Sequence, residues 1–85
     1  MRYTVAFTNS AAREFKALER ATQRRISARI DELANHPFPP GVKKLQGEPD
    51  LYRIRIGDYR VLYRVDGKRM TVLILKIGHR RDVYR

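Results

Sequence analysis

Three runs with the character of β-strands follow one another in the second half of the chain. They span residues 51–56, 59–65 and 70–77, separated by the dipeptides Gly57-Asp58 and Asp66-Gly67. Both dipeptides favour tight hairpin turns, and alternation of apolar and polar residues along the first two runs is typical of strands with one buried face. The sequence therefore predicts an antiparallel meander with one apolar and one polar face.

A short strand and an amphipathic helix are predicted before residue 20. The strand is indicated by three alternating apolar residues, Tyr3, Val5 and Phe7. N-cap candidates for the helix are found at Thr8-Asn9-Ser10. The apolar stripe of the helix consists of Ala11, Phe15 and Leu18. The charged residues between these positions, Glu14 among them, are expected on the solvent side.

A second helix and a long loop should follow. Thr22 can cap the helix, whose apolar positions are Ile26, Ile30, Leu33 and Ala34. Three prolines in the segment 36–41 end it, because proline continues neither a helix nor a strand ladder. The loop is expected to run to about Asp50.

The resulting order, β-α-α-β-β-β, predicts an α+β fold: an antiparallel sheet with a helical hairpin packed on one face. Residues 1–85 are expected to form a single domain, because 85 residues suffice for one modest core. The other face of the sheet is left without a helix.

Strand parity assigns side chains to the two faces. A two-residue turn at Gly57-Asp58 places Arg55 opposite Arg60 and Ile56 opposite Tyr59. The helix side then receives Tyr52, Ile54, Ile56, Val61, Tyr63 and Val65. The opposite side receives Arg53, Arg55, Arg60, Leu62 and Arg64, and we call it the arginine face. Whether the second turn has two or four residues, Val72 and Ile74 fall on the helix side and Thr71, Leu73 and Leu75 on the arginine face.

The charge distribution indicates a polyanionic partner. The net charge is +10, and residues 51–85 contribute +7 of it, with ten Lys and Arg against three acids. Guanidinium groups match phosphate geometry, whereas two arginines directly opposite each other weaken a sheet. Alternatively, each arginine is solvated or paired with an acid. The leucines of the arginine face could stack a base, dock a partner, or be covered by the C-terminal tail.

Several classes of protein are disfavoured by the composition. The chain has no cysteine, two histidines and no carboxylates spaced for a metal site, so we expect no disulfide, no metal and no cofactor. No apolar stretch is long enough for a membrane span, and the N-terminus lacks the apolar region of a signal peptide. A cytoplasmic protein without membrane contact is expected.

Metal-free RNA cleavage would suit the arginine face. It requires a base for the 2′-hydroxyl, positive charge for the transition state and an acid for the leaving oxygen. The nearby candidates for proton transfer are His79, with an ordinary pKa near 6.5, and Tyr84, whose pKa surrounding cations could lower. The alternative is a surface histidine and a packing tyrosine.

The segments LYRIRIGDYRVLYRV and ILKIGHRRDVYR, together with the order of elements, closely resemble the RelE toxins of the RelE/ParE superfamily over essentially the whole chain. This resemblance implies a ribosome-dependent endoribonuclease that cuts mRNA in the A site of the 30S subunit through 2′-hydroxyl attack. It also implies neutralisation by an acidic, RelB-like antitoxin, in a hetero-oligomeric complex that binds DNA through the antitoxin. The alternatives are a ParE-like inhibitor of DNA gyrase and a non-catalytic RNA- or ribosome-binding module.

The resemblance also implies roles for individual residues. Catalytic candidates are Arg53, Arg55, Arg60, His79, Arg80, Arg81 and Tyr84. Apart from the resemblance, the basic residues Arg53, Arg55, Arg60, Arg64, Lys43 and Lys44 are expected to bind RNA. Arg53 and Arg55 stand where well-studied relatives have lysine, and an arginine cannot readily give up a proton. His79 follows Gly78 where some relatives have lysine, so histidine is expected to act in place of Tyr84 or beside it.

Overall fold

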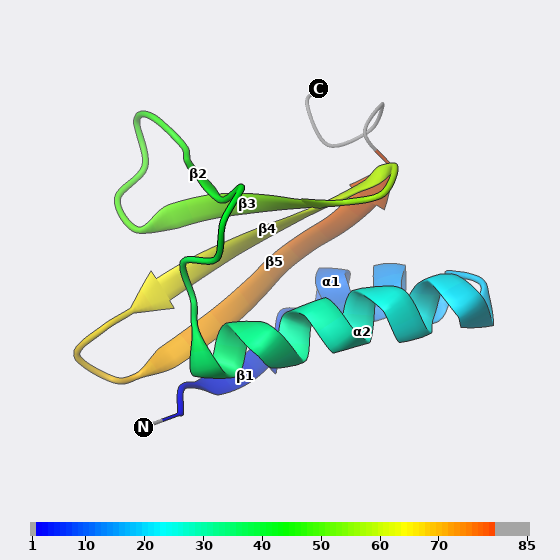
Figure 1. Ribbon diagram of the computed structural model, residues 1–85, viewed down its shortest axis with the longest axis horizontal. Coiled ribbons are helices and arrows are strands. Elements are labelled where there is room, and N and C mark those ends of the chain that lie inside the picture. Colours follow the sequence, from blue (N-terminus) through cyan, green and yellow to red (C-terminus); the bar gives the residue numbers. More distant parts are fainter. Residues whose placement is uncertain (1, 80–85) are drawn as a thin grey trace.

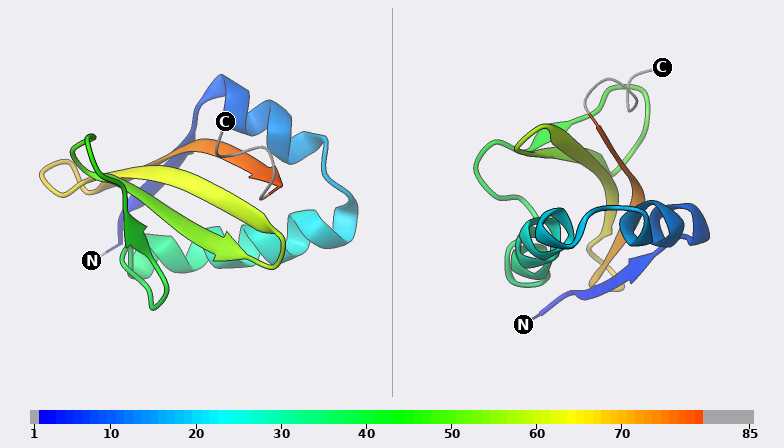
Figure 2. Two further views of the ribbon diagram at one scale, coloured as in Figure 1. Left: turned by 90° about the horizontal axis from the view of Figure 1, so that it is seen from above. Right: turned by 90° about the vertical axis from the view of Figure 1, so that its right-hand side faces the viewer.

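Two helices lie on one face of a five-stranded sheet in the computed structural model, which describes residues 2–79 (Figure 1). The helices are α1 (Asn9–Lys16) and α2 (Arg20–Asn35). The strands are β1 (Thr4–Phe7), β2 (Lys43–Lys44), β3 (Leu51–Ile56), β4 (Tyr59–Asp66) and β5 (Thr71–His79). Their order in the sheet is β1-β5-β4-β3-β2. Figure 2 shows both helices on the same side of the strands, which confirms the two-layer α+β prediction.

The sheet is mixed, whereas a wholly antiparallel one was predicted. β3, β4 and β5 form the expected antiparallel meander, but β1 runs parallel to β5, from Thr4 opposite Thr71 to Phe7 opposite Ile74. Periodicity reports which face a side chain takes and carries no information on the direction of a neighbouring strand. β2 was not predicted, because two residues are too few to show an alternation.

The first helix begins as predicted, and the second begins earlier. Thr8 is the N-cap of α1, and its hydroxyl accepts a hydrogen bond from the Ala11 amide at 3.1 Å. α2 has Glu19 at its N-cap, so the assignment of that position to Thr22 was wrong. Its first turns also serve α1, because the Gln23 side-chain amide donates to the Phe15 carbonyl at 3.0 Å. The Phe15 carbonyl also accepts from the Leu18 amide at 3.1 Å, and the same Gln23 amide reaches the Lys16 carbonyl at 3.3 Å, so Gln23 helps to satisfy the carbonyls at the end of α1.

The core lies between the helical stripe and the helix side of the sheet. Its fully buried side chains include Ala11, Ile26, Leu33, Ile54, Val61, Tyr63, Val72 and Ile74. These positions confirm the predicted strand parity and the apolar stripe of the second helix. In the first helix Ala11 is buried and Phe15 packs against the core, but Leu18, predicted on the same stripe, lies beyond the end of α1 and is partly buried there. Within residues 2–79, no polar or charged residue is classed as buried. Burial of this apolar surface is the main source of the fold's stability.

Tyr63 anchors the proline loop to the sheet. Its ring is fully buried, and its hydroxyl donates to the carbonyl of Pro37, also buried, at 2.7 Å. Tyr52 stacks on it with ring centroids 6.0 Å apart, and Phe38 meets Tyr52 edge-on at 5.0 Å. These contacts fix the segment after α2 against β4, whose opposite face carries Arg60 and Arg64.

Replacing Tyr63 with phenylalanine is expected to lower stability and change its pH dependence. Tyr63→Phe leaves the Pro37 carbonyl without its donor, which costs about 1 kcal/mol of unfolding free energy. Burial, followed by the influence of Tyr52, raises the pKa of Tyr63 above its ordinary value. The folded protein therefore keeps this proton when the unfolded chain loses it, and the associated stability, present below about pH 10, is lost above it.

Urea unfolding of both proteins at pH 7 and pH 10.5 measures these effects. The variant should be less stable at pH 7 and should lose less stability on going to alkaline pH. Tyr3→Phe, at the edge of the core, is the control and should behave as the parent. Equal stabilities of Tyr63→Phe and the parent at pH 7 would contradict the anchoring role.

Candidate nucleic-acid interface

The hairpin of β3 and β4 has the register that the sequence predicts. Arg55 lies opposite Arg60, and Arg53 lies opposite Leu62. Gly57 adopts the positive φ of +61°, which favours glycine in this two-residue turn. The turn between β4 and β5 is the four-residue form, since Asp66 pairs with Thr71. The alternation that buries one face therefore gathers Arg53, Arg55, Arg60 and Arg64 on the other.

Three of these arginines form a closely coupled group. Burial, followed by the charges of Arg60 and Arg55, lowers the pKa of Arg53 from its ordinary value. Arg60 is half-buried, with its Nε atom inaccessible to solvent, and lies opposite Gly78 of β5. Arg55 is exposed, and its Nε donates to the Gly57 carbonyl at 3.2 Å. Each guanidinium loses hydration or faces another cation, so a bound anion would be stabilising here.

Arg64 has an acid near it, at one end of the arginine face. Its Nη2 is 3.8 Å from a carboxylate oxygen of Glu48, in the loop before β3. With 41% and 58% of the two side chains exposed, this is a weak surface pair. Leu51 and Leu73 flank Arg64 on the neighbouring strands. Arg64 thus lies at an apolar and partly neutralised end of the face.

The two loop lysines point to different faces. Lys43 pairs with Arg53 and so extends the arginine face across β2, whereas Lys44 pairs with Tyr52 on the helix side. The structure supports grouping Lys43 with the arginines and separates Lys44 from them. This division depends on the short strand β2, which the sequence did not reveal.

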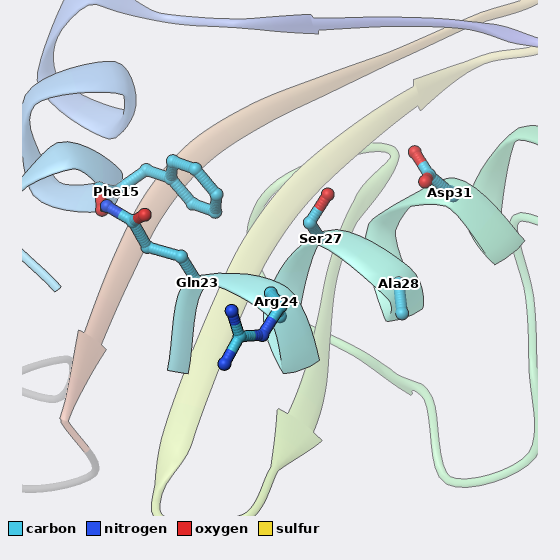
Figure 3. Close-up of a pocket in the computed structure, with 6 residues that line it drawn as sticks. All are labelled: Phe15, Gln23, Arg24, Ser27, Ala28 and Asp31. Carbon is cyan, nitrogen blue, oxygen red and sulfur yellow. The ribbon is translucent and has the colours of Figure 1, made fainter. Parts of the chain in front are cut away.

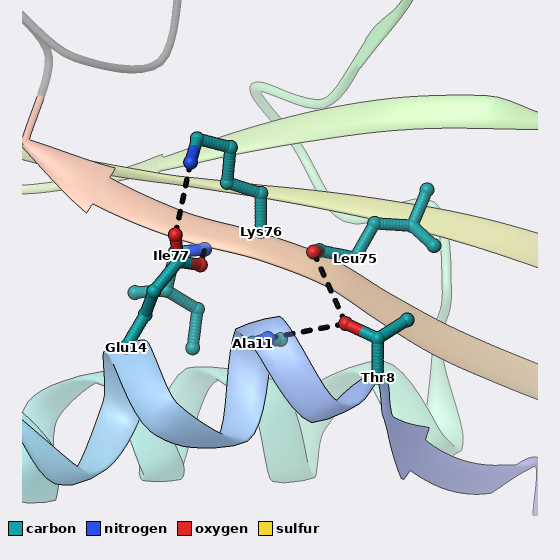
Figure 4. A network of polar contacts seen from close by, with 6 residues as sticks. All are labelled: Thr8, Ala11, Glu14, Leu75, Lys76 and Ile77. Atoms are coloured by element: carbon teal, nitrogen blue, oxygen red, sulfur yellow. Dashed lines mark hydrogen bonds and ion pairs between the residues drawn. The ribbon is translucent and has the colours of Figure 1, made fainter.

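A β-bulge adds a basic residue that sequence reasoning missed. The register shifts between Leu62 and Tyr63, so that Lys76 faces Leu62 while Ile74 faces Tyr63, leaving Leu75 as the extra residue. Figure 4 shows Leu75 and Lys76 leaving β5 on the same side, away from α1. The signal was present in the spacing, because burial of both Ile74 and Ile77 breaks a strict period of two.

His79 is not on the arginine face. It pairs with Tyr59, which packs against the core, and their rings meet edge-on with centroids 5.7 Å apart. The expected proton-transfer residue therefore stands on the helix side at the end of the sheet, one residue past the glycine beside Arg60. The other candidates of this segment, Arg80, Arg81 and Tyr84, lie outside the described residues.

The apolar part of the arginine face is half-buried. Leu62, Leu73 and Leu75 each retain some exposure between the cations. Their place beside the arginines agrees with the predicted parity, with Leu75 reaching it through the bulge. A surface of this kind can hold a phosphate backbone and also contact a flat base.

A hollow of about 490 Å³ opens between the helices and is lined by Phe15, Gln23, Arg24, Ser27, Ala28 and Asp31 (Figure 3). The arginine side chains of the strands do not line it.

Within residues 2–79, no group of three or more His, Cys, Asp or Glu side chains could hold a metal ion. No helix in the same span is long and apolar enough to cross a membrane.

Comparison with known proteins assigns this chain to a class of small toxins. Residues 5–84 match the family described as the ParE toxin of type II toxin–antitoxin systems. Toxin RelG of Mycobacterium tuberculosis is 35% identical over 86 residues, covering 100% of this chain and 99% of that protein. A putative RelE-like toxin protein of Escherichia coli is 30% identical over 88 residues, covering 99% and 92%.

Solved structures agree with this assignment. The archaeal RelE-RelB complex from Pyrococcus horikoshii contains a chain with a TM-score of 0.84 and 36% identity, covering 98% of this chain and 100% of that one. The toxin–antitoxin complex RelBE2 from Mycobacterium tuberculosis gives 0.82 and 32%, covering 93% and 99%. The chain therefore belongs to the RelE family of toxins within the RelE/ParE superfamily.

Removal of one cross-strand arginine should not destabilise the fold. Arg55→Ala relieves the repulsion from Arg60 and gives up an exposed hydrogen bond, so its unfolding free energy should equal or exceed that of the parent by up to about 1 kcal/mol. Added salt screens the same repulsion and should therefore stabilise the parent more than the variant. Thermal unfolding at 50 mM and 500 mM NaCl measures both effects. The Debye length is longer than about 10 Å at the lower concentration and shorter at the higher one.

Arg69→Ala is the matched control. This arginine, in the loop between β4 and β5, has 84% of its side chain exposed and lies 3.9 Å from Asp66. Its removal should leave the response to salt unchanged. A fall in melting temperature for Arg55→Ala at both salt concentrations would show that the fold depends on the Arg55 side chain.

Proposed function

We propose that this chain is the toxin of a type II toxin–antitoxin pair and acts as a ribosome-dependent endoribonuclease that cleaves mRNA in the A site. The observation that carries the proposal is the coupled group of Arg53, Arg55 and Arg60 on a sheet face that α1 and α2 leave uncovered. Cations that repel one another in the free protein are best explained by a partner that supplies negative charge. The family relationship makes mRNA on the ribosome the favoured partner, in the cytoplasm where translation occurs.

The proposed chemistry divides the work between the arginines and two other groups. The 2′-hydroxyl attacks the adjacent phosphorus, the 5′-oxygen leaves, and a cyclic phosphate remains. Arg53, Arg55 and Arg60 stay protonated and stabilise the charge that develops on the phosphorane-like transition state. The proposed groups for proton removal and return are Tyr84 and His79, the latter at the end of β5 on the helix side, one residue past Gly78, which lies beside Arg60. Arg80 or Arg81 adds a further cation.

The nucleic-acid contacts extend beyond the reacting phosphate. Lys43 and Arg64 lie on the arginine face with Arg53, Arg55 and Arg60. They would contact phosphates of mRNA or ribosomal RNA next to the phosphate that reacts. Lys44, on the other side of β2, is left for contacts outside this face. Phosphate contacts of this kind fix the position of the RNA without selecting a sequence.

An acidic antitoxin of the RelB type is the proposed partner in the resting state. The solved complexes of similar chains contain RelB antitoxins. A net charge of +10 favours fast association with an acidic protein. The complex would be hetero-oligomeric and would bind DNA through the antitoxin.

Inhibition of DNA gyrase is the second candidate function, favoured by the match of residues 5–84 to the family described as ParE toxin. Members of that class share the fold without being nucleases. The basic strand cluster and Tyr84 favour the nuclease. A non-catalytic module that only binds RNA or the ribosome would need the arginines but neither His79 nor Tyr84.

An assay with purified ribosomes carrying a defined mRNA tests the proposal. The parent chain should produce breaks within the A-site codon. Arg60→Ala should lower the single-turnover rate about 100-fold, the usual effect of removing one group that stabilises the transition state. The double variant His79→Ala with Tyr84→Phe should show no cleavage above background, whereas Arg69→Ala should keep the parental rate.

Other results assign the alternatives. Intact mRNA with the parent chain, combined with inhibition of gyrase supercoiling, would replace the nuclease by the gyrase inhibitor. Growth arrest that survives the His79 and Tyr84 double variant but not Arg60→Ala would favour the binding module.

A further inference from the structure

Among residues 2–79, no strand pairs with the outer side of the last part of β5. β1 pairs with β5 only as far as Phe7 opposite Ile74, while β5 continues to His79. Backbone groups at such an edge need other partners, because an unpaired amide or carbonyl is costly once water is excluded. The edge also coincides with the bulge at Leu75, where a strand most easily changes register.

Thr8 supplies the first of these partners. Its amide donates to the Ile74 carbonyl at 3.0 Å, which extends the β1 ladder by one residue. Its hydroxyl then donates to the Leu75 carbonyl at 3.2 Å while accepting from the Ala11 amide (Figure 4). One residue therefore caps α1 and holds the bulge.

Glu14 supplies the next partners and takes the place of a neighbouring strand. Its Oε1 accepts from the Ile77 amide at 2.9 Å, and its Oε2 accepts from the Lys76 ammonium at 2.9 Å (Figure 4). Only 30% of the Glu14 side chain and 40% of the Lys76 side chain are exposed. A carboxylate in this position is well shielded, and its hydrogen bonds are stronger than those of a surface ion pair. The sequence had placed Glu14 on the solvent side of its helix, and this was wrong.

These contacts fix the register of β5 against β4 at the candidate site. Slipping the strand by one residue beyond Lys76 would exchange the faces of every later side chain. Gly78 now lies beside Arg60, and His79 beside Tyr59. The bond between Glu14 and the Ile77 amide fixes the residue directly before Gly78 and His79.

We propose that Glu14 is a positioning residue for RNA cleavage. It contacts no reacting atom, and acts by holding the bulge of β5 and thereby the register in which Gly78 lies beside Arg60, so that Arg60 is correctly placed for a phosphate bound at Arg53, Arg55 and Arg60. This inference rests on the proposed nuclease function. The part of Glu14 that matters is an acceptor oxygen at the right distance from Ile77, and the negative charge is secondary.

Two substitutions of Glu14 separate distance from charge, and Glu14→Ala removes the whole carboxylate. Glu14→Gln keeps an acceptor oxygen at the same reach and loses the charge, whereas Glu14→Asp keeps the charge and is one methylene too short. Lys76→Met removes the ion pair and leaves the bond to Ile77. Glu19→Ala is the control, because Glu19 is an exposed acid before α2 whose side chain makes no capping hydrogen bond. Circular dichroism establishes that each variant is folded.

Cleavage of ribosome-bound mRNA is measured with kcat and KM determined separately. Glu14→Asp and Glu14→Ala should lower kcat about 10- to 100-fold, as expected for misplacement of a reacting group by roughly 1 Å, with KM within about twofold of the parent. Glu14→Gln and Glu19→Ala should keep kcat within about threefold. Lys76→Met also removes a cation of the arginine face, so it is compared by amide exchange at Ile77 alone, which should stay at the parental rate. Amide hydrogen exchange at Ile77 should accelerate at least about tenfold in Glu14→Asp but not in Glu14→Gln, because only Asp loses the bond that protects it.

Parental kcat in Glu14→Asp, or a loss in Glu14→Gln as large as in Glu14→Asp, would overturn the inference. If Glu14→Ala fails to fold, the comparison of Gln with Asp still decides. Absence of cleavage by the parent chain would instead remove the proposed function and, with it, the role in catalysis. Exchange at Ile77 would then show separately whether Glu14 holds the strand.

Discussion

Burial of one face of the β3-β4-β5 meander under the two helices is the constraint on which the rest of the structure depends. Val61, Tyr63 and Ile74 are fully buried against helix residues such as Ile26 and Leu33. Once these side chains point inward, their neighbours must point outward, because strand side chains alternate. The same apolar burial that stabilises the fold thus gathers the arginines without any contact dedicated to them.

The arginine face places function in conflict with stability. Arg55 opposite Arg60, with Arg53 half-buried beside them, is an arrangement that weakens a free sheet. Local violations of this kind are expected at functional sites, where a partner completes the charge balance. Glu48 balances only Arg64, at the edge of the cluster, and Glu14 engages Lys76 outside it.

Parity and turn chemistry account for the parts of the site that could be predicted. The pairing of Arg55 with Arg60 follows from a two-residue turn and alternation alone. Lys43 could not be assigned a face, because its strand has two residues and no periodicity of its own. Lys76 was missed because a bulge changes the period within β5, although the buried Ile77 marks the change. The side of the sheet that His79 takes depends on the same bulge.

The sequence by itself determined the α+β class, the helical hairpin, the hairpin register and the identity of the arginine face, since all of these follow from local periodicity and turn residues. Only the tertiary structure decided that β1 runs parallel to β5, that β5 outlasts β1, and that Glu14 covers the edge so exposed. These features arise from contacts between residues more than 60 positions apart, as between Glu14 and Ile77, and no local pattern encodes them. The cations of the site thus follow from the sequences of its strands, whereas the placement of its last strand depends on a helix at the other end of the chain.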